Sequence, residues 1–342
     1  MKKSYKEAML YDKLEGNKCR CNICEKRCVV RQGRSGYCRT RYNDEGNLYS
    51  VIYGRVASEA ISPIEKKPMY HFYPGSLWLS IGSLGCNFYC PGCQNFDLTF
   101  VDVMKEINSF PFVSPEESVE IALRKGCKGI SWTYNEPALW FEYTLESAKL
   151  AKKAGLLTNY VTNGYMTEEA LKLISPCLDS FRVDLKGFSE KFYREICHVH
   201  DFTPVLSRIT EAKKYGIHVE IITNVIPSYS DDDGQLEHIA SWIADNAGRD
   251  TPWHITRFYP HLKLSHVGPT PVKTLEKARQ IGLSKGLYYV YLGNVPGHDG
   301  ENTCCHACGK LLVERYGMQV CKNLVRENKC PYCSNEIPGR FS

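Results

Sequence analysis

Three cysteines directly after an apolar segment restrict what this chain can bind and how it can fold. Residues 77–81 read as a buried strand, and Cys86, Cys90 and Cys93 follow it in the spacing C-x3-C-x2-C. Sulfur-rich sites select iron–sulfur clusters, zinc or copper(I). A structural zinc site needs four ligands, and the sequence offers no fourth cysteine nearby. Three thiolates can instead hold three irons of a [4Fe–4S] cube and leave the fourth iron open to chelate a small ligand.

A second group of cysteines stands near the start of the chain: Cys21, Cys24, Cys28 and Cys38, with Cys19 just upstream. Four thiols suffice for a structural zinc ion, and they would also suffice for an auxiliary iron–sulfur cluster. The C-x2-C-x3-C spacing is compatible with both. We favour zinc, in a small module that covers the central fold.

A third group consists of two C-x2-C pairs near the end of the chain, Cys305/Cys308 and Cys330/Cys333. Two such pairs suit a tetrahedral four-cysteine site, with structural zinc favoured and a rubredoxin-like iron as the alternative. A closed site of this kind can fold a short appendage that has little core of its own. The scattered cysteines, which we interpret as small core residues, are Cys127, Cys177 and Cys197.

Composition limits the classes of partner. The chain has 342 residues, a formal net charge of +5 and 43% hydrophobic residues, which is enough for a packed core. No Lys/Arg block is present, so nucleic acid is an unlikely partner. We find no signal peptide and no apolar run of roughly 18 residues, so no membrane span is expected. With 17 cysteines and no export signal, metal use in the cytoplasm is a better explanation than disulfides.

Strand-like and helix-like segments alternate between the terminal cysteine groups, which indicates parallel βαβ units. We expect an α/β fold with a TIM-like barrel, complete or partial, and keep an open doubly wound sheet as the alternative. Turn-rich segments place boundaries near residues 75 and 300, giving modules 1–75, 76–300 and 301–342. The expected strands are 77–81, 130–134, 157–161, 180–183, 219–224, 254–258 and 288–292, and the expected helices begin near 115, 141, 168, 205, 236 and 274.

Unusual polar sequences follow the ends of the expected strands, where barrel enzymes build their sites. This pattern favours the barrel over the open sheet. Besides the three-cysteine loop, the segments are Asn135-Glu136-Pro137, Thr162-Asn163-Gly164, Asp184-Leu185-Lys186, 224–227 and Gly293-Asn294.

The loop at 81–95 resembles the cluster loop of radical S-adenosylmethionine (SAM) enzymes. Over most of its length, from Cys21 to Pro338, the chain resembles the radical SAM proteins of the AmmeMemoRadiSam system, which are similar to the activating enzyme of pyruvate formate-lyase. The segments that carry this resemblance are the four N-terminal cysteines, 62–68, 85–90, 133–137, 184–186, 293–297 and the terminal cysteine pairs.

The resemblance implies that Cys86, Cys90 and Cys93 hold a [4Fe–4S] cluster whose open iron binds SAM. Tyr89, next to the second cysteine, would pack on the adenine. Asn135 and Glu136 occupy the place of a stretch that binds the SAM amino group, and a carboxylate is a sensible acceptor for an ammonium. A local salt bridge is the alternative for Glu136.

The resemblance also extends to two later strand ends. Thr162 and Asn163 match an Asp-Thr-Asn-Gly stretch, although Val161 replaces the aspartate, which puts the polar contact of that aspartate in doubt. Asp184 and Lys186 match an Asp-Leu-Lys stretch. Lys186 would pair with the SAM carboxylate, or form a local ion pair.

On the strand at 254–258, His254 and Thr256 share one face. Either this polar face or Arg257 should point toward SAM or substrate. A hydrogen-bonded core histidine is the alternative for His254.

The expected reaction is reductive cleavage of SAM, followed by hydrogen abstraction from an unidentified substrate by a 5′-deoxyadenosyl radical. A flavodoxin- or ferredoxin-type reductant would supply the electron. The resemblance implies linkage with AMMECR-type and Memo-type proteins, and similarity to activating enzymes suggests a glycyl radical on a partner protein. The alternative function is a non-enzymatic electron carrier or a zinc-ribbon adaptor.

Overall fold

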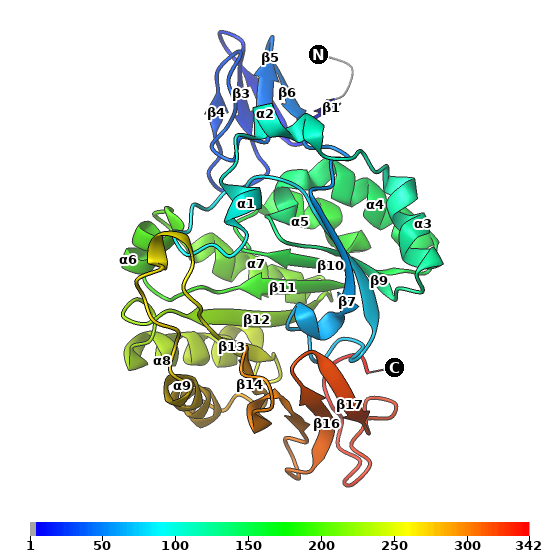
Figure 1. Cartoon of the computed structure of the whole chain (residues 1–342), viewed down its shortest axis with the longest axis vertical. Helices are drawn as coiled ribbons and strands as arrows, with labels where there is room; N and C mark the ends of the chain where they lie inside the picture. The colour runs from blue at the N-terminus through cyan, green and yellow to red at the C-terminus, as the bar shows by residue number, and fades with distance from the viewer. Residues whose placement is uncertain (1–4, 342) are drawn as a thin grey trace.

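The structure is a computed structural model, and it describes residues 5–341. Its centre is an eight-stranded sheet in the spatial order β14-β13-β12-β11-β10-β9-β8-β7 (Figure 1). Strands β8 to β14 are mutually parallel, while β7 pairs antiparallel with β8. The bounds are β7 (Ser58–Pro63), β8 (Leu77–Gly82), β9 (Gly129–Trp132), β10 (Leu157–Thr162), β11 (Ser180–Asp184), β12 (His218–Val225), β13 (Trp253–Arg257) and β14 (Val290–Gly293).

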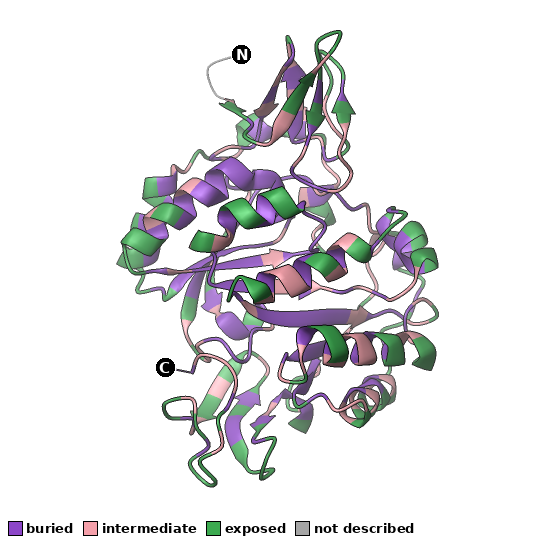
Figure 2. Cartoon of the chain, turned by 180° about the vertical axis from the view of Figure 1, so that it is seen from behind, coloured by how far each residue is buried: buried purple, intermediate pink, exposed green. Residues whose placement is uncertain are grey.

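Helices connect consecutive parallel strands and cover the outside of the sheet (Figure 1). The longer ones are α3 (Pro115–Arg124), α4 (Phe141–Lys153), α5 (Glu168–Ile174), α7 (Thr203–Lys214), α8 (Asp233–Trp242) and α9 (Val272–Ser284). Shorter helices are α1 (Phe96–Thr99), α2 (Val103–Glu106) and α6 (Glu190–Phe192), with 3₁₀ turns at Ile64–Lys66, Ile107–Ser109, Pro137–Trp140, Ser175–Cys177, Leu262–Leu264 and Asp299–Glu301. Two helices continue into π-helical turns, Tyr193–Cys197 after α6 and Ile243–Ala247 after α8. The parallel strands β8 to β14 are mostly buried, and the helices expose their outer faces (Figure 2).

Small antiparallel sheets form both ends of the chain. At the N-terminus, β1 (Lys6–Glu7), β6 (Asn47–Ser50) and β5 (Arg41–Asp44) form one sheet, and β2 (Tyr11–Leu14), β3 (Lys18–Cys21) and β4 (Val29–Val30) form another. The C-terminal sheet contains β15 (Thr303–Cys304), β16 (Leu311–Tyr316) and β17 (Gln319–Asn323). These modules lie at opposite ends of the molecule in Figure 1.

The two modules are built on different cores. Buried N-terminal residues such as Ile23 and Leu48 belong to the same hydrophobic cluster as the central sheet. Buried C-terminal residues such as Leu312 and Val313 form a separate cluster with Tyr70 and Tyr291. The N-terminal module is therefore continuous with the barrel core, whereas the C-terminal module has a small core of its own.

The predicted fold class is confirmed as a partial TIM-like barrel. All seven predicted strands exist, and the helix signals at Ser114 and Thr167 are correct: Ser114 forms a capping box with Glu117, and Thr167 accepts from the Ala170 amide. The edge strand β7 was not predicted, and it joins the sheet although it lies within the predicted module 1–75. The module boundaries themselves stay a prediction. Every helix within residues 5–341 is too short or too polar to cross a bilayer.

Candidate functional site

The three-cysteine loop leaves the sheet at the carboxyl end of β8. Asn135 holds the start of this loop, because its Oδ1 accepts from the Ser83 amide (3.0 Å) and its Nδ2 donates to the Leu84 carbonyl (3.1 Å). Gly85 then turns the chain with a φ of +82°, a conformation that favours glycine. The structure therefore gives Asn135 the role of shaping the loop.

Polar groups lie within hydrogen-bonding range of two thiols of this loop, those of Cys86 and Cys93. The Phe88 amide lies 3.4 Å from Cys86 Sγ, and Asn163 Nδ2 lies 3.8 Å from the same sulfur. Thr99 Oγ1 lies 3.4 Å from Cys93 Sγ. Donors of this kind stabilise negative charge on sulfur, so the donor set fits thiolates that bind an iron–sulfur cluster.

Glu136 joins two of the predicted strand-end segments. It lies in the loop after β9, and its Oε1 accepts from Thr162 Oγ1 (2.7 Å) and the Ala138 amide (3.1 Å). Its Oε2 accepts from the Asn163 amide (2.8 Å). All three donors are neutral, and burial raises the pKa of Glu136 to about 7. Glu136, Thr162 and Asn163 thus form one cluster, and Asn163 connects it to Cys86.

Asp184 and Lys186 lie together after β11. Lys186 Nζ is 2.8 Å from Asp184 Oδ2, and Arg182 also pairs with Asp184. Burial opposes the charge on Asp184, but Arg182 and Lys186 hold the pKa of Asp184 below its usual value. Burial likewise opposes the charge on Lys186, yet Asp184 and the neighbouring thiol of Cys90 raise the pKa of Lys186. The predicted local ion pair is present, and it lies beside the three-cysteine loop.

Tyr89 lies among aromatic and basic side chains. Its ring centroid is 4.0 Å from that of Phe100 and 6.0 Å from that of His198. The cationic groups of Arg39 and Lys263 each lie 5.9 Å from the ring. Tyr89 is only partly buried, so part of its side chain stays accessible.

Sequence reasoning missed two neighbours of this site. Cys197, interpreted as an ordinary core residue, ends the π-helical turn Tyr193–Cys197 and lies against Cys90. A hydrogen bond with the Cys197 thiol lowers the pKa of Cys90, and burial raises the pKa of Cys197. Arg182, the second partner of Asp184, was also missed. The separation of Cys197 from Cys90 in the sequence left no signal for their contact.

The structure corrects the prediction for His254. Its Nε2 lies 2.6 Å from Glu220 Oε2, and its ring stacks on Tyr291 with centroids 5.1 Å apart. Glu220 also accepts from the Tyr70 and His71 amides. His254 is therefore a core histidine in a buried polar network, which was the stated alternative.

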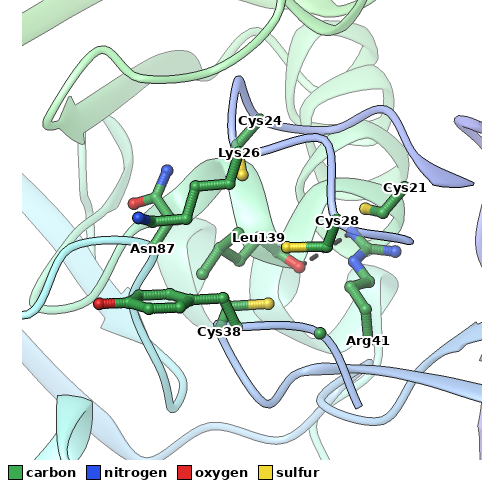
Figure 3. Close-up of a pocket in the computed structure, with 10 residues that line it drawn as sticks. Cys21, Cys24, Lys26, Cys28, Cys38, Arg41, Asn87 and Leu139 are labelled. Carbon is green, nitrogen blue, oxygen red and sulfur yellow. Dashed lines mark hydrogen bonds between the residues drawn. The ribbon is translucent and has the colours of Figure 1, made fainter. Parts of the chain in front are cut away.

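The N-terminal cysteines surround a cavity (Figure 3). Cys21, Cys24, Cys28 and Cys38 line one pocket together with Lys26, Arg41, Asn87 and Leu139. The isolated bridge between Cys24 and Met166 and the hydrogen bond from the Thr167 amide to the Ile23 carbonyl (3.0 Å) attach this segment to the loop after β10. The sequence predicted these four cysteines as one site, and they do converge.

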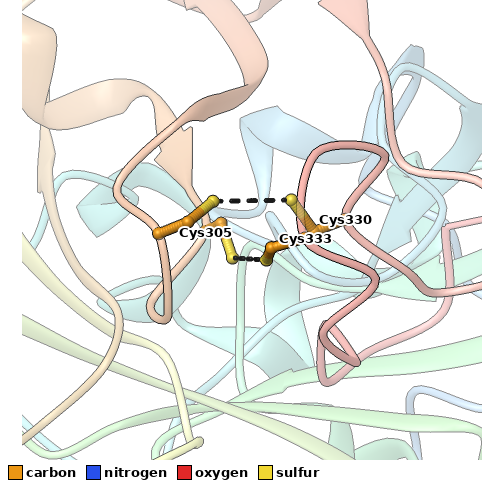
Figure 4. Close-up of side chains that lie close together, drawn as sticks. Cys305, Cys330 and Cys333 are labelled. Carbon is orange, nitrogen blue, oxygen red and sulfur yellow. Dashed lines mark hydrogen bonds between the residues drawn. The ribbon is translucent and has the colours of Figure 1, made fainter.

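The C-terminal cysteines converge more tightly (Figure 4). The Sγ atoms of Cys305, Cys308, Cys330 and Cys333 all lie within 4.8 Å of one another. The contacts are 3.6 Å between Cys305 and Cys333 and 3.7 Å between Cys308 and Cys330. Such a group could hold one metal ion.

Comparisons with known proteins agree with this geometry. Residues 80–242 match the radical SAM superfamily. An uncharacterized protein of Methanocaldococcus jannaschii is 42% identical over 97% of this chain and 98% of its own length. A probable GTP 3′,8-cyclase of Sulfolobus acidocaldarius is 23% identical over 73% of this chain and 71% of its own. A radical SAM methyltransferase structure from Sphaerobacter thermophilus has a TM-score of 0.50 at 14% identity, covering 67% of this chain and 71% of that one, which shows a shared fold.

Proposed function

The chain contains a radical SAM superfamily domain, and from this premise we propose that it cleaves SAM reductively and abstracts hydrogen from a substrate. One observation carries the proposal: Cys86, Cys90 and Cys93 lie in C-x3-C-x2-C spacing on the loop after β8, inside the matched segment. We assign these cysteines as the ligands of the [4Fe–4S] cluster that the family implies. When bound, the cluster supplies the electron that cleaves SAM to methionine and a 5′-deoxyadenosyl radical.

Glu136 is assigned to the SAM amino group. Its carboxylate is buried and accepts only from the neutral donors Thr162, Ala138 and Asn163. A buried carboxylate without a cation is costly, and a ligand ammonium would offset that cost with a charge-assisted hydrogen bond. Thr162 and Asn163 act here as positioning residues.

Lys186 is assigned to the carboxylate of SAM, and Tyr89 to its adenine. Lys186 carries its charge beside Cys90 and is held by Asp184, so it would pair with a carboxylate at the cluster. The partly buried Tyr89 ring would stack on the adenine.

The finer identity of the protein is also a proposal. We propose that it is a radical SAM protein of the AmmeMemoRadiSam system, resembling pyruvate formate-lyase activating enzyme. The support is the joint pattern of the four N-terminal cysteines, the three-cysteine loop, Asp184-Leu185-Lys186, 293–297 and the terminal cysteine pairs. An external flavodoxin- or ferredoxin-type protein is the proposed electron donor, and AMMECR-type and Memo-type proteins are proposed partners.

The test measures 5′-deoxyadenosine. The protein is reconstituted anaerobically with iron and sulfide, reduced with dithionite and given SAM. Wild type should form 5′-deoxyadenosine, and Cys90→Ala should form none because the cluster loses a ligand. Cys127→Ala is the matched control, since Cys127 is a buried cysteine outside the site, and it should behave as wild type.

Two outcomes would contradict the proposal. Product formation by Cys90→Ala would reject the cluster ligands assigned here. No product from cluster-loaded wild type would shift the assignment to a non-enzymatic electron carrier.

A further inference from the structure

The two four-cysteine sites differ in the spacing of their sulfur atoms. A tetrahedral zinc ion with Zn–S bonds of about 2.3 Å requires sulfur atoms roughly 3.8 Å apart. The C-terminal contacts of 3.6 and 3.7 Å match that requirement. Within residues 5–341, the C-terminal four are the one group with ligand atoms close enough for a single ion. The N-terminal four line one pocket, but their ligand atoms are not among those that lie within 4.8 Å of one another.

Two buried hydrogen-bond donors that line this cavity have no partner. Arg41 is fully buried, and its guanidinium donates to Glu142 Oε1 (2.7 Å) and the Leu139 carbonyl (3.0 Å), but Nε donates to nothing. Asn87 is also fully buried, and its Nδ2 has no acceptor. Buried donors are nearly always satisfied. Two of them around one cavity therefore point to an acceptor that the protein itself does not provide.

We propose that Cys21, Cys24, Cys28 and Cys38 hold a second iron–sulfur cluster, and not the zinc ion that the sequence favoured. A cluster binds each thiolate through a different iron, so it suits thiols that lie too far apart to share a single ion. Its bridging sulfides are acceptors for Arg41 Nε and Asn87 Nδ2, and hydrogen bonds to sulfur are a recognised feature of such sites. With four cysteine ligands its coordination is closed, so this cluster has no open iron for SAM.

The second cluster would lie against the three-cysteine loop. A Cβ atom added at Gly85 would come within 2.7 Å of the Cys38 carbonyl oxygen, so the two backbones are in direct contact. Asn87 follows Cys86 in the chain, its Oδ1 accepts from Asn163 Nδ2 (2.7 Å), and the residue also lines the N-terminal pocket. Asn87 therefore lines the N-terminal pocket (Figure 3) and also adjoins Cys86 of the three-cysteine loop.

The test removes the first cluster and counts what is left. A full-length Cys86→Ala/Cys90→Ala/Cys93→Ala variant is reconstituted anaerobically, desalted and analysed for iron, zinc and acid-labile sulfide. We expect about two to four labile sulfides per chain, the content of a four-cysteine cluster, with a sulfur-to-iron charge-transfer absorption. This readout is independent of SAM cleavage, so it fails or succeeds separately from the proposed function.

Two further variants on that background locate the cluster. Adding Cys24→Ala and Cys28→Ala should lower labile sulfide at least fivefold, whereas adding Cys305→Ala and Cys308→Ala should leave it unchanged. Zinc without labile sulfide in the triple variant would overturn the proposal. The triple variant keeps all N-terminal cysteines, so this result cannot be caused by unfolding of a substituted N-terminal module. Sulfide that persists without Cys24 and Cys28 would overturn it as well.

Discussion

Each end of the chain brings four cysteines together, but the two groups differ in the spacing of their sulfur atoms and in the core that surrounds them. The C-terminal thiols lie within 4.8 Å of one another beside a small separate core. The N-terminal thiols surround a cavity in a module whose buried residues continue the barrel core. We propose that four cysteines stabilise the C-terminal module, which has little core of its own, and bind a cofactor in the N-terminal module, which shares the barrel core. The sulfur spacing, and not the cysteine count, separates the two.

Metal removal should destabilise the C-terminal module more than the rest of the chain. Structural zinc contributes about 10–16 kcal/mol of folding free energy in small zinc-binding peptides, and the C-terminal core is too small to replace it. Cys330→Ser should therefore lose zinc and make residues 301–341 sensitive to protease, while the barrel stays resistant. Elemental analysis and limited proteolysis measure both effects. Equal resistance of the variant and wild type, or iron in place of zinc, would contradict this prediction.

The N-terminal module should instead depend on its contact with the barrel. Arg41 and Glu142 form an ion pair of 2.7 Å with side chains 1% and 0% exposed. Arg41→Leu leaves the Glu142 charge buried and unpaired, which should cost about 3–5 kcal/mol in the free energy of unfolding. Lys105→Leu is the control, because the Lys105–Asp102 pair is exposed and such pairs contribute about 0–1 kcal/mol. Urea unfolding compares them, and equal losses would refute a special role for Arg41.

Glu136 provides the opposite case, a buried carboxylate that has no cation. Its folded pKa of about 7 lies above the ordinary value of 4.5. The folded state therefore binds more protons, and stability falls as pH rises from 4.5 to 7. At 1.36 kcal/mol per pKa unit, this loss is about 3 kcal/mol.

Glu136→Gln cannot titrate, so the cofactor-free variant should lack that decline. It should also bind SAM more weakly, because the amide has no charge for the ammonium. Unfolding at pH 4.5 and 7.5 measures the first effect, and SAM titration of the reconstituted protein measures the second. Parallel pH profiles for the variant and wild type would show that Glu136 does not titrate in this range.

Local sequence signals predicted the parts of this fold that neighbours along the chain determine. Alternating segments gave the seven parallel strands, and the caps at Ser114 and Thr167 follow from side chains three residues from their acceptors or donors. The cysteine groups were found for the same reason, since short spacings bring thiols together. The other residues that surround each cysteine group come from distant parts of the sequence, so local signals did not predict them.

Those distant contacts explain what was missed. Arg41 meets Glu142, 101 positions later in the chain, and β7 is recognisable only from its pairing with β8. Two alternatives stayed open for His254, because strand periodicity gives a face but not the partner Glu220. The metal at the N-terminal site stays a prediction, because the spacing of cysteines in the sequence says nothing about the distances between their sulfur atoms.

Cys197 gives the smallest expected effect. If it were a fourth cluster ligand, the three-cysteine site would become a four-cysteine site with no open iron. The thiol lies against Cys90, but it comes from a π-helical turn that also packs through Tyr193, which is fully buried. If its role is packing, Cys197→Ala should cost about 1 kcal/mol for one lost buried atom and leave 5′-deoxyadenosine formation within about twofold of wild type. Iron content and 5′-deoxyadenosine formation, measured for Cys197→Ala and Cys90→Ala side by side, show whether Cys197 packs in the core or binds iron. Loss of iron in Cys197→Ala would make Cys197 a fourth ligand, and with no open iron the proposed chemistry could not proceed.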